Sequence, residues 1–173
     1  MSLHSELGVQ KEYSPNDAQN AVFMSSYLDS LVLVERLHRL LLDVIKDEFE
    51  RLGVIEINPV QALLLFNVGE AEVTAGELKT RGYYQGSNVS YNLKKLVEGG
   101  YMHHQRCGVD RRSVRVRLTE KGRRVSEIVS KLFANHADGL QGRGVVDLNG
   151  METITASLKR IERYWADQIR YIY

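Results

Sequence analysis

Apolar residues recur at helical spacing over much of the chain, which predicts a mainly helical protein. No glycine or proline interrupts residues 21–52, so this stretch is predicted to form one long helix that ends at Gly53. Asn58 and Pro59 are the residue types favoured just before a helix and at its first position. The helix that they begin, VQALLLFNV, is almost wholly apolar and closes at Gly69, so we expect it to be buried.

Two further helices are predicted in close succession. Thr74 and Glu77 are three residues apart and fit a capping box, in which each side chain bonds a backbone N–H near the other, so a short helix begins there. After the connection YYQG, a second helix is expected over residues 87–98, with Ser87 as its N-cap and two glycines at its end. Its apolar face carries Val89, Leu93, Leu96 and Val97. Helix, tight connection and helix form a helix-turn-helix.

A charged β-hairpin is expected directly after this motif. Residues 101–106 and 113–118 are strand-like, and the second run alternates apolar residues with Arg115 and Arg117, which should face outward. The turn CGVDRRS between the two runs carries two adjacent arginines. A hairpin in this position is a wing.

Two long helices complete the predicted fold. Thr119 is expected to cap a helix that runs through roughly His136, after which three glycines break the chain. The last helix should begin near Asp147 or Asn149, and it has one apolar stripe at spacings of three and four residues. The stripe consists of Ile154, Leu158, Ile161, Trp165, Ile169 and Ile172. It needs a partner surface, which is either the first long helix of the same chain or a second copy.

Positive charge is concentrated on the predicted motif and wing. Residues 94–124 contain ten Lys or Arg and three acids, a net charge of +7, whereas the whole chain carries +1 and the remainder therefore −6. Clustered Lys and Arg on one module are typical of a surface that binds phosphates, so we expect double-stranded DNA as a partner.

Composition and motifs exclude several classes of protein. The 173 residues, 43% of them apolar and 26% charged, favour a globular chain, and the single cysteine excludes an internal disulfide. With no apolar run of about 20 residues and no signal-peptide centre, we expect a cytoplasmic protein without membrane contact. No G-x-S-x-G, Walker A, G-x-G-x-x-G or H-E-x-x-H pattern occurs, and His103 and His104 should point to opposite faces of a strand. We therefore expect no enzyme activity, cofactor or metal site.

The wing carries the most specific likeness to a known family. Asp110-Arg111-Arg112-Ser113 is followed by Val116, Leu118-Thr119 and Lys121-Gly122, and the preceding helix ends LKKLVEGGYM. These residues resemble the wing signature and the helix-to-strand passage of the MarR family, the multiple antibiotic resistance regulators of bacteria. The resemblance covers the chain from about Ala21 to the C-terminus. One departure is the aromatic connection YYQG, where many relatives have small or aliphatic residues.

The resemblance implies a mainly α fold with a small β-wing, in a homodimeric DNA-binding transcription regulator. A flexible polar arm over residues 1–18 would precede a single domain, 19–173. In that domain residues 58–122 would be the winged helix-turn-helix, and residues 19–57 and 123–173 the dimerisation helices. The contacts of the last helix with the second copy would be Leu158, Ile161, Trp165, Ile169 and Ile172.

By the same resemblance, the dimer would bind a pseudo-palindromic operator and would act as a repressor by default. The helix 87–98 would enter the major groove and the wing 106–114 the minor groove. Arg112 would lie in that groove, and Asp110 would brace the wing tip by pairing with an arginine. A small aromatic or phenolic effector is also expected, with pocket residues that the sequence does not indicate.

The predicted DNA contacts divide into base readers and phosphate binders. An Asn amide can bond adenine N6 and N7 together, so Asn88 is the first candidate to read a base; its alternative role is helix capping. Tyr91 could bond a phosphate, meet a thymine methyl or pack on the wing, whereas Lys94 and Lys95 should meet phosphates or solvent. The full set of expected contacts is Ser87, Asn88, Ser90, Tyr91, Lys94, Lys95, Arg111, Arg112 and Arg115.

Two other interpretations stay open. Winged helices also serve as protein-interaction or assembly modules, which need neither a basic recognition helix nor an arginine-tipped wing. Cys107 lies beside Arg106, and neighbouring cations can make a thiol reactive, so a redox-responsive regulator is the second alternative.

We expect Arg112→Ala to weaken operator binding by about 1–3 kcal/mol, because a narrow A·T-rich minor groove has an enhanced negative potential that attracts arginine. The fold should be retained. Fluorescence anisotropy against an operator duplex measures the change, and an unchanged titration curve would exclude this arginine from the interface.

Overall fold

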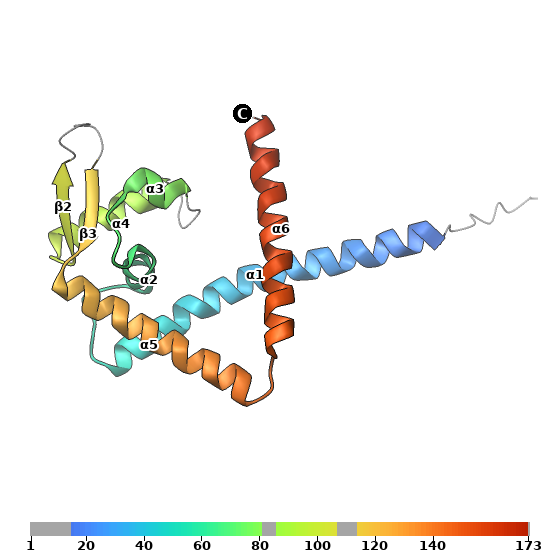
Figure 1. Ribbon diagram of the computed structural model, residues 1–173, viewed down its shortest axis with the longest axis horizontal. Helices are drawn as coiled ribbons and strands as arrows, with labels where there is room; N and C mark the ends of the chain where they lie inside the picture. Colours follow the sequence, from blue (N-terminus) through green and yellow to red (C-terminus); the bar gives the residue numbers. More distant parts are fainter. Residues whose placement is uncertain (1–14, 81–85, 107–113, 173) are drawn as a thin grey trace, which may run out of the picture. The chain divides into compact units, whose positions relative to one another are not determined.

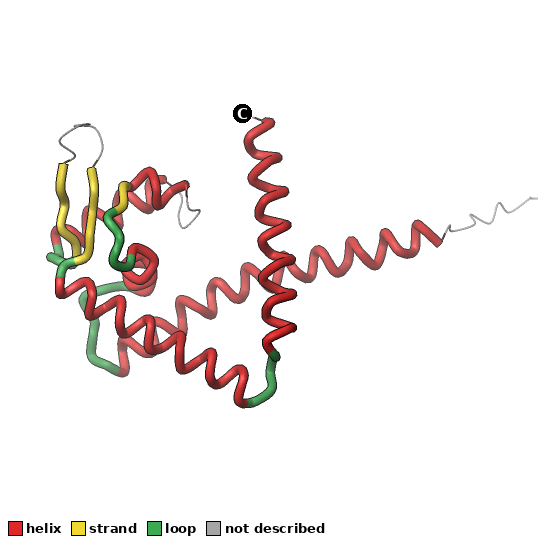
Figure 2. Tube along the Cα trace, viewed as in Figure 1, coloured by secondary structure: helices red, strands yellow, loops and turns green. Residues whose placement is uncertain are grey.

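A computed structural model describes residues 15–80, 86–106 and 114–172 of the chain (Figure 1, Figure 2). Helices dominate, and one three-stranded sheet accompanies them. This confirms the expected mainly α fold with a small β-wing. The chain divides into two compact units, Met1–Val44 and Ile45–Tyr173, which are described in turn.

The described part of the first unit is a single helical segment. α1 spans Pro15–Arg51, and its last turns belong to the second unit. The helix begins at Pro15, earlier than the predicted start near Ala21, so residues 15–18 of the predicted arm are helical; residues 1–14 lie outside the described part. The fixed φ and missing N–H of Pro15 suit a first helical turn, and Asp17 complements the positive end of the helix dipole.

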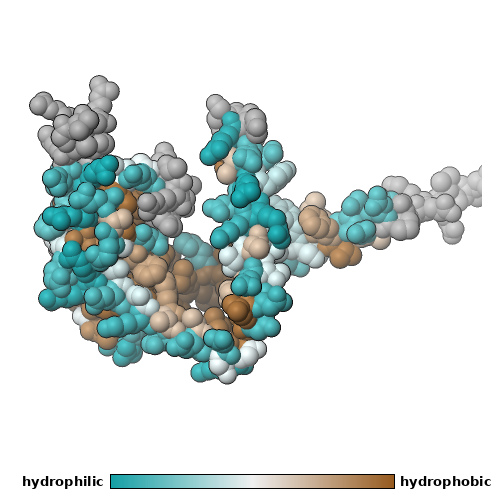
Figure 3. Space-filling model, in the orientation of Figure 1, coloured by the Kyte–Doolittle hydropathy of each residue, from teal (hydrophilic) through white to brown (hydrophobic). Residues whose placement is uncertain are grey.

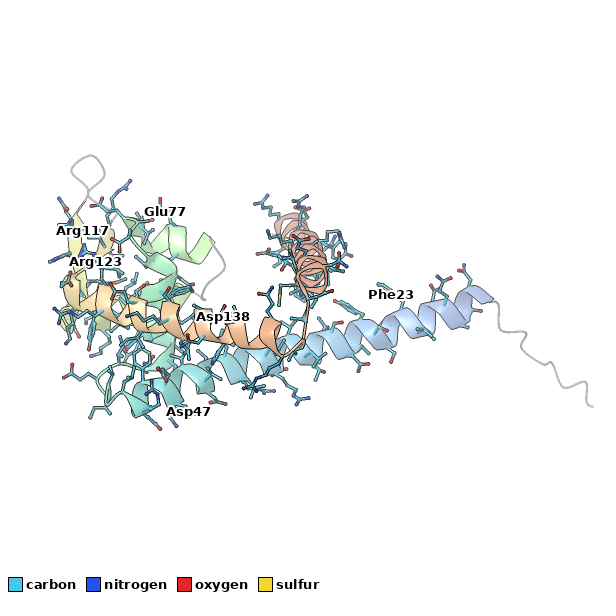
Figure 4. All side chains as sticks on the ribbon, turned by 60° about the horizontal axis from the view of Figure 1, so that its bottom comes forward. Phe23, Asp47, Glu77, Arg117, Arg123 and Asp138 are labelled. Atoms are coloured by element: carbon cyan, nitrogen blue, oxygen red, sulfur yellow. The ribbon has the colours of Figure 1, made fainter. Side chains whose placement is uncertain are left out.

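Large apolar side chains are exposed along this segment of α1, and Figure 3 shows apolar surface on it. They are Val22, Phe23, Met24, Leu28, Val32, Leu33, Val34, Leu37 and Leu40, each 46–73% exposed. The ring of Phe23 projects from the helix (Figure 4). So many exposed apolar side chains on one helix form a surface suited to contact with another polypeptide.

The second unit contains a winged lobe followed by two long helices. Its elements after α1 are α2 (Pro59–Val68), β1 (Val73–Thr74), α3 (Ala75–Thr80), α4 (Gly86–Glu98), β2 (Met102–Arg106), β3 (Val114–Leu118), α5 (Glu120–Gly142) and α6 (Leu148–Ile172). This order confirms the predicted succession of helix, helix-turn-helix, wing and two long helices.

The first helices of the lobe start at the predicted capping signals. Asn58 Oδ1 accepts from the Gln61 N–H at 2.9 Å, and Gln61 Oε1 accepts from the Asn58 N–H at 3.2 Å. Thr74 and Glu77 form the same reciprocal pair before α3, at 2.6 and 3.1 Å. α2 ends at Gly69, whose φ of 57° is one that glycine adopts without strain. All three predictions are confirmed.

The sheet has the strand order β1-β3-β2, and both pairings are antiparallel. On β3, Val116 and Leu118 are buried while Arg115 and Arg117 are exposed, which confirms the predicted alternation. The sequence pattern does not predict β1. This strand has only two residues, too few to show an alternation, and it is defined by pairing of Val73 with Val116.

The core of this unit draws on nearly every element. Its largest fully buried side chains are Ile45, Leu64, Leu65, Val73, Leu78, Val89, Leu96 and Val129, which come from α1, α2, β1, α3, α4 and α5. Phe66 of α2 and Phe133 of α5 also meet edge to face, with ring centroids 5.1 Å apart. α5 therefore packs on α2 and contributes side chains to the core of the lobe.

α5 begins as predicted but ends later. Thr119 caps it by accepting from the Gly122 N–H at 3.1 Å. The helix continues to Gly142, so the end predicted near His136 is wrong. A glycine inside a helix costs only about 1 kcal/mol relative to alanine, which the rest of the helix can offset.

The turn between α5 and α6 lies further along the chain. Gly144 has a φ of 64°, in the left-handed region that favours glycine. Asp147 then caps α6 by accepting from the Gly150 N–H at 2.7 Å. Of the two predicted starts, Asp147 is therefore the one that the structure confirms.

The first turn of α5 lies against the residue that precedes β2. The Tyr101 carbonyl accepts from the Thr119 N–H at 3.0 Å, and a Cβ at Gly122 would overlap that carbonyl oxygen. Lys121 donates to Glu56 at 3.1 Å and lies 4.1 Å from the centre of the Tyr101 ring. The hydrogen bonds that Lys121 and then Tyr101 donate lower the pKa of Glu56. These contacts join the α1–α2 loop, the end of α4 and α5.

Gly122→Ala should lower the free energy of unfolding by about 1–3 kcal/mol, because the added methyl overlaps backbone that must then move. Gly139→Ala is the matched control in the same helix: nothing lies within 4 Å of a Cβ there, so alanine should raise stability by up to about 1 kcal/mol. Urea unfolding followed by circular dichroism measures both variants. Equal stability of Gly122→Ala and the parent chain would contradict the close approach.

Candidate nucleic-acid interface

α4 separates a buried apolar face from an exposed polar one. Val89, Leu93 and Leu96 are at most 7% exposed, on a helix that contacts α3 and β2. The outer face of α4, as we call its exposed side, carries Ser90, Tyr91, Lys94 and Lys95. The predicted division of this helix is confirmed from Val89 onward. Hydroxyl and ammonium groups presented on one helix face can bond phosphates and base edges.

The first turn of α4 differs from the prediction. The helix begins at Gly86, one residue before Ser87, the predicted N-cap, whose capping role stays a prediction. The side chains of Ser87 and Asn88 lie outside the described part, and their base contacts stay predictions. Asn92, which the sequence analysis does not single out, is buried on the inner side at 8% exposure.

Both lysines of the outer face pair with the last residue of α4. Lys94 Nζ lies 3.8 Å from Glu98 Oε1, and Lys95 Nζ lies 3.3 Å from Glu98 Oε2. Lys95 Nζ also lies 6.0 Å from the centre of the Tyr91 ring. Glu98 therefore belongs to this surface, although the sequence analysis does not assign it. Its spacing of three and four residues from the lysines is the signal that could have found it.

A pocket of about 340 Å³ lies between α4 and the sheet. Its lining consists of Ser90, Leu93, Lys94, Val97, Glu98, His104 and Val116. His104 thus faces α4, whereas His103 is paired in register with the outward-facing Arg117. The two histidines lie on opposite faces of β2, as predicted.

The outer side of the wing carries exposed arginines. Arg115 and Arg117 are exposed, and the register sets them opposite Gln105 and His103 on β2. Arg123, labelled with Arg117 in Figure 4, forms an ion pair instead: its Nε lies 3.3 Å from a carboxylate oxygen of Glu70, which follows α2. Arg115, a predicted contact, is therefore presented on the outer side of the wing.

The wing tip lies outside the described residues. Arg111, Arg112, Asp110 and Cys107 fall within residues 107–113, so their predicted roles stay predictions. In the parts of the chain that are described, no group of three or more His, Cys, Asp or Glu side chains could hold a metal ion. Nor does any helix there have the length and apolar content of a membrane span.

The predicted partner surface on α6 is largely exposed. Leu158, Trp165 and Ile169 are 44%, 41% and 62% exposed, and Ile161 is half-buried. Ile172 is the last residue of the helix, and its side chain lies outside the described part. Large apolar side chains at this spacing form one continuous stripe along the helix.

Three comparisons place this architecture among known proteins. A family model for a winged helix DNA-binding domain matches residues 57–122. The exopolysaccharide II synthesis transcriptional activator ExpG of Rhizobium meliloti (strain 1021) is 37% identical over 146 residues, which cover 84% of this chain and 75% of that protein.

Solved structures share the fold. The crystal structure of a MarR transcriptional regulator from Methanosarcina mazei Go1 has a TM-score of 0.64 and 24% identity, covering 82% of this chain and 98% of that one. A putative MarR family transcriptional regulator from Listeria monocytogenes, crystallised with a 26mer DNA, has a TM-score of 0.69 and 17% identity, covering 82% and 92%.

The matched segment 57–122 corresponds to the winged lobe, from the residue before the Asn58 cap to the first turn of α5. The identity to ExpG extends over most of both chains, well beyond that lobe. The protein is therefore a DNA-binding transcription regulator of the winged helix type; it belongs to the same family as the transcriptional activator ExpG and has the fold of MarR regulators.

Proposed function

We propose that this protein is a homodimeric, sequence-specific regulator that binds a pseudo-palindromic operator. The exposed polar and basic outer face of α4 is the observation that supports the proposal best. In the proposed complex the helix 87–98 lies in the major groove and the wing 106–114 lies in the minor groove. The Listeria monocytogenes protein of the same fold was crystallised with DNA, which supports DNA as the partner of this chain.

The proposed contacts divide between bases and phosphates. An α-helix fits the major groove, which is about 12 Å wide, and there Asn88 in the first turn would read an adenine. Lys94, Lys95 and Arg115 would bond phosphates and so set register and affinity. Arg112 would enter the minor groove from the wing tip. Sequence preference would then come from the first turn of α4 and from groove shape.

A second copy of the chain is the proposed partner of the exposed apolar helices. The stripe on α6 is largely exposed, and so are the apolar side chains of α1 within the first unit of the chain. Association of two chains would remove them from water, which is favourable by about 25 cal/mol for each Å² of apolar surface. A two-fold dimer would also carry two winged lobes and match a palindromic site.

The direction of regulation and the effector are further proposals. Repression by occlusion of a promoter is the default that the family resemblance implies. The relative ExpG is named a transcriptional activator, which favours activation as the second candidate. We propose a small aromatic or phenolic molecule as the effector.

Lys94→Ala/Lys95→Ala should weaken binding to a duplex from the upstream region of the protein's own gene and to an unrelated duplex by similar factors, since phosphates are common to both. The slope of log K against log salt should fall in magnitude by up to about two. Fluorescence anisotropy at several salt concentrations measures both quantities. Lys131→Ala, at an exposed position on α5, is the control and should change little.

The same titration separates the proposed function from its main alternative. If the parent chain bound no duplex even at low salt, the protein-interaction module would become the better explanation. If the double lysine variant kept full affinity, the outer face of α4 would not be the phosphate-binding surface.

Leu158→Glu should convert the dimer to a monomer at micromolar concentration, because a charge would be buried without a partner in the proposed interface. Ala156→Glu introduces the same charge about 200° around the helix and should leave the dimer intact. Sedimentation velocity distinguishes the two states. Dimers of unchanged stability in both variants would remove α6 from the interface.

A further inference from the structure

The last residue of α4 carries a carboxylate that contacts both exposed lysines of the outer face. Glu98 Oε1 lies 3.8 Å from Lys94 Nζ, and Glu98 Oε2 lies 3.3 Å from Lys95 Nζ. One negative charge thus offsets part of two positive charges, on the surface proposed to bind phosphates.

Helix stability gains little from this carboxylate. Glu98 is the C-terminal residue of α4, where the negative end of the helix dipole disfavours an anion. The pair with Lys94 also has the lysine on the N-terminal side, which is the weaker of the two orientations four residues apart. A neutral or basic side chain would suit this position better. The clearest consequence of the glutamate is therefore its pairing with the two lysines.

The two ion pairs are open to exchange with another anion. The side chains of Lys94, Lys95 and Glu98 are 74%, 49% and 48% exposed. Exposed pairs of this kind are weak. A DNA phosphate offers each lysine the same charge as the carboxylate does. After the exchange, the unpaired carboxylate would lie close to the DNA backbone, where like charges repel.

We propose that Glu98 is an intramolecular competitor of DNA phosphates and limits the affinity of α4 for any duplex. The inference rests on the proposed function, namely that the outer face of α4 meets DNA, and it assigns a regulating residue to that site. Glu98 lowers the sequence-independent part of binding, which otherwise holds a regulator on DNA that lacks its operator. Because this effect is the same on every duplex, the preference for one site over another stays with the base contacts.

Glu98→Gln in the full chain tests the proposal, because glutamine keeps the shape and removes the charge. The Kd for a duplex from the upstream region of the protein's own gene, and that for an unrelated duplex of equal length, should fall by the same factor, about threefold to tenfold. The slope of log K against log salt should become steeper by about one. Fluorescence anisotropy at several salt concentrations gives both values, and a thermal melt checks the fold.

Two controls separate pairing from net charge. Glu127→Gln removes the same charge from an exposed position on α5 and should have less than half the effect. In the Lys94→Ala/Lys95→Ala background, Glu98→Gln should lose most of its effect, because the two lysines through which it acts are absent. An equal gain from Glu127→Gln, or a full gain without the lysines, would overturn the proposal.

The remaining outcomes are also decisive. If the parent chain binds DNA and Glu98→Gln binds equally well or more weakly, this inference is wrong and the proposed function stands. If neither chain binds any duplex even at low salt, the inference and the proposed function both fail.

Discussion

The winged lobe depends on a close approach between two backbone segments. The carbonyl of Tyr101, just after α4, accepts the N–H of Thr119, just before α5, and Gly122 passes over that oxygen where any side chain would overlap it. This contact fixes the direction in which α5 leaves the wing. α5 also packs on α2 through Phe66 and Phe133. The end of α4 is thus connected to α2 through its contact with the start of α5.

A firmly buried inner face allows the outer face of α4 to vary in charge without loss of the fold. Val89 and Leu96 are almost fully buried, whereas Lys94, Lys95 and Glu98 are all exposed. In the proposed complex, the binding strength of this face is a balance between attraction to phosphates and internal pairing, and both change with salt. A regulator benefits from such a balance, because electrostatic attraction alone does not distinguish an operator from other DNA.

The long helices present the opposite situation, since their exposed side chains are apolar rather than charged. Phe23 on α1 and Trp165 on α6 are 73% and 41% exposed. Apolar surface of this extent is unusual on a chain that acts alone. The lobe buries its apolar side chains within one chain, whereas apolar side chains of α1 and of α6 are exposed, and this difference underlies the proposed homodimer.

Local signals determined much of the molecule from sequence alone: the Asn58 cap, the alternation around Val116 and the two faces of α4 join residues at most four apart. The pairing of Glu98 with its lysines has equally short spacing, so the sequence also contains the signal for this contact. Only the tertiary structure decided the strand β1 and the approach at Gly122, because each depends on contacts between residues distant in the chain. The continuation of α5 past Gly139 also required the structure, since neighbouring turns outweigh a local propensity of about 1 kcal/mol.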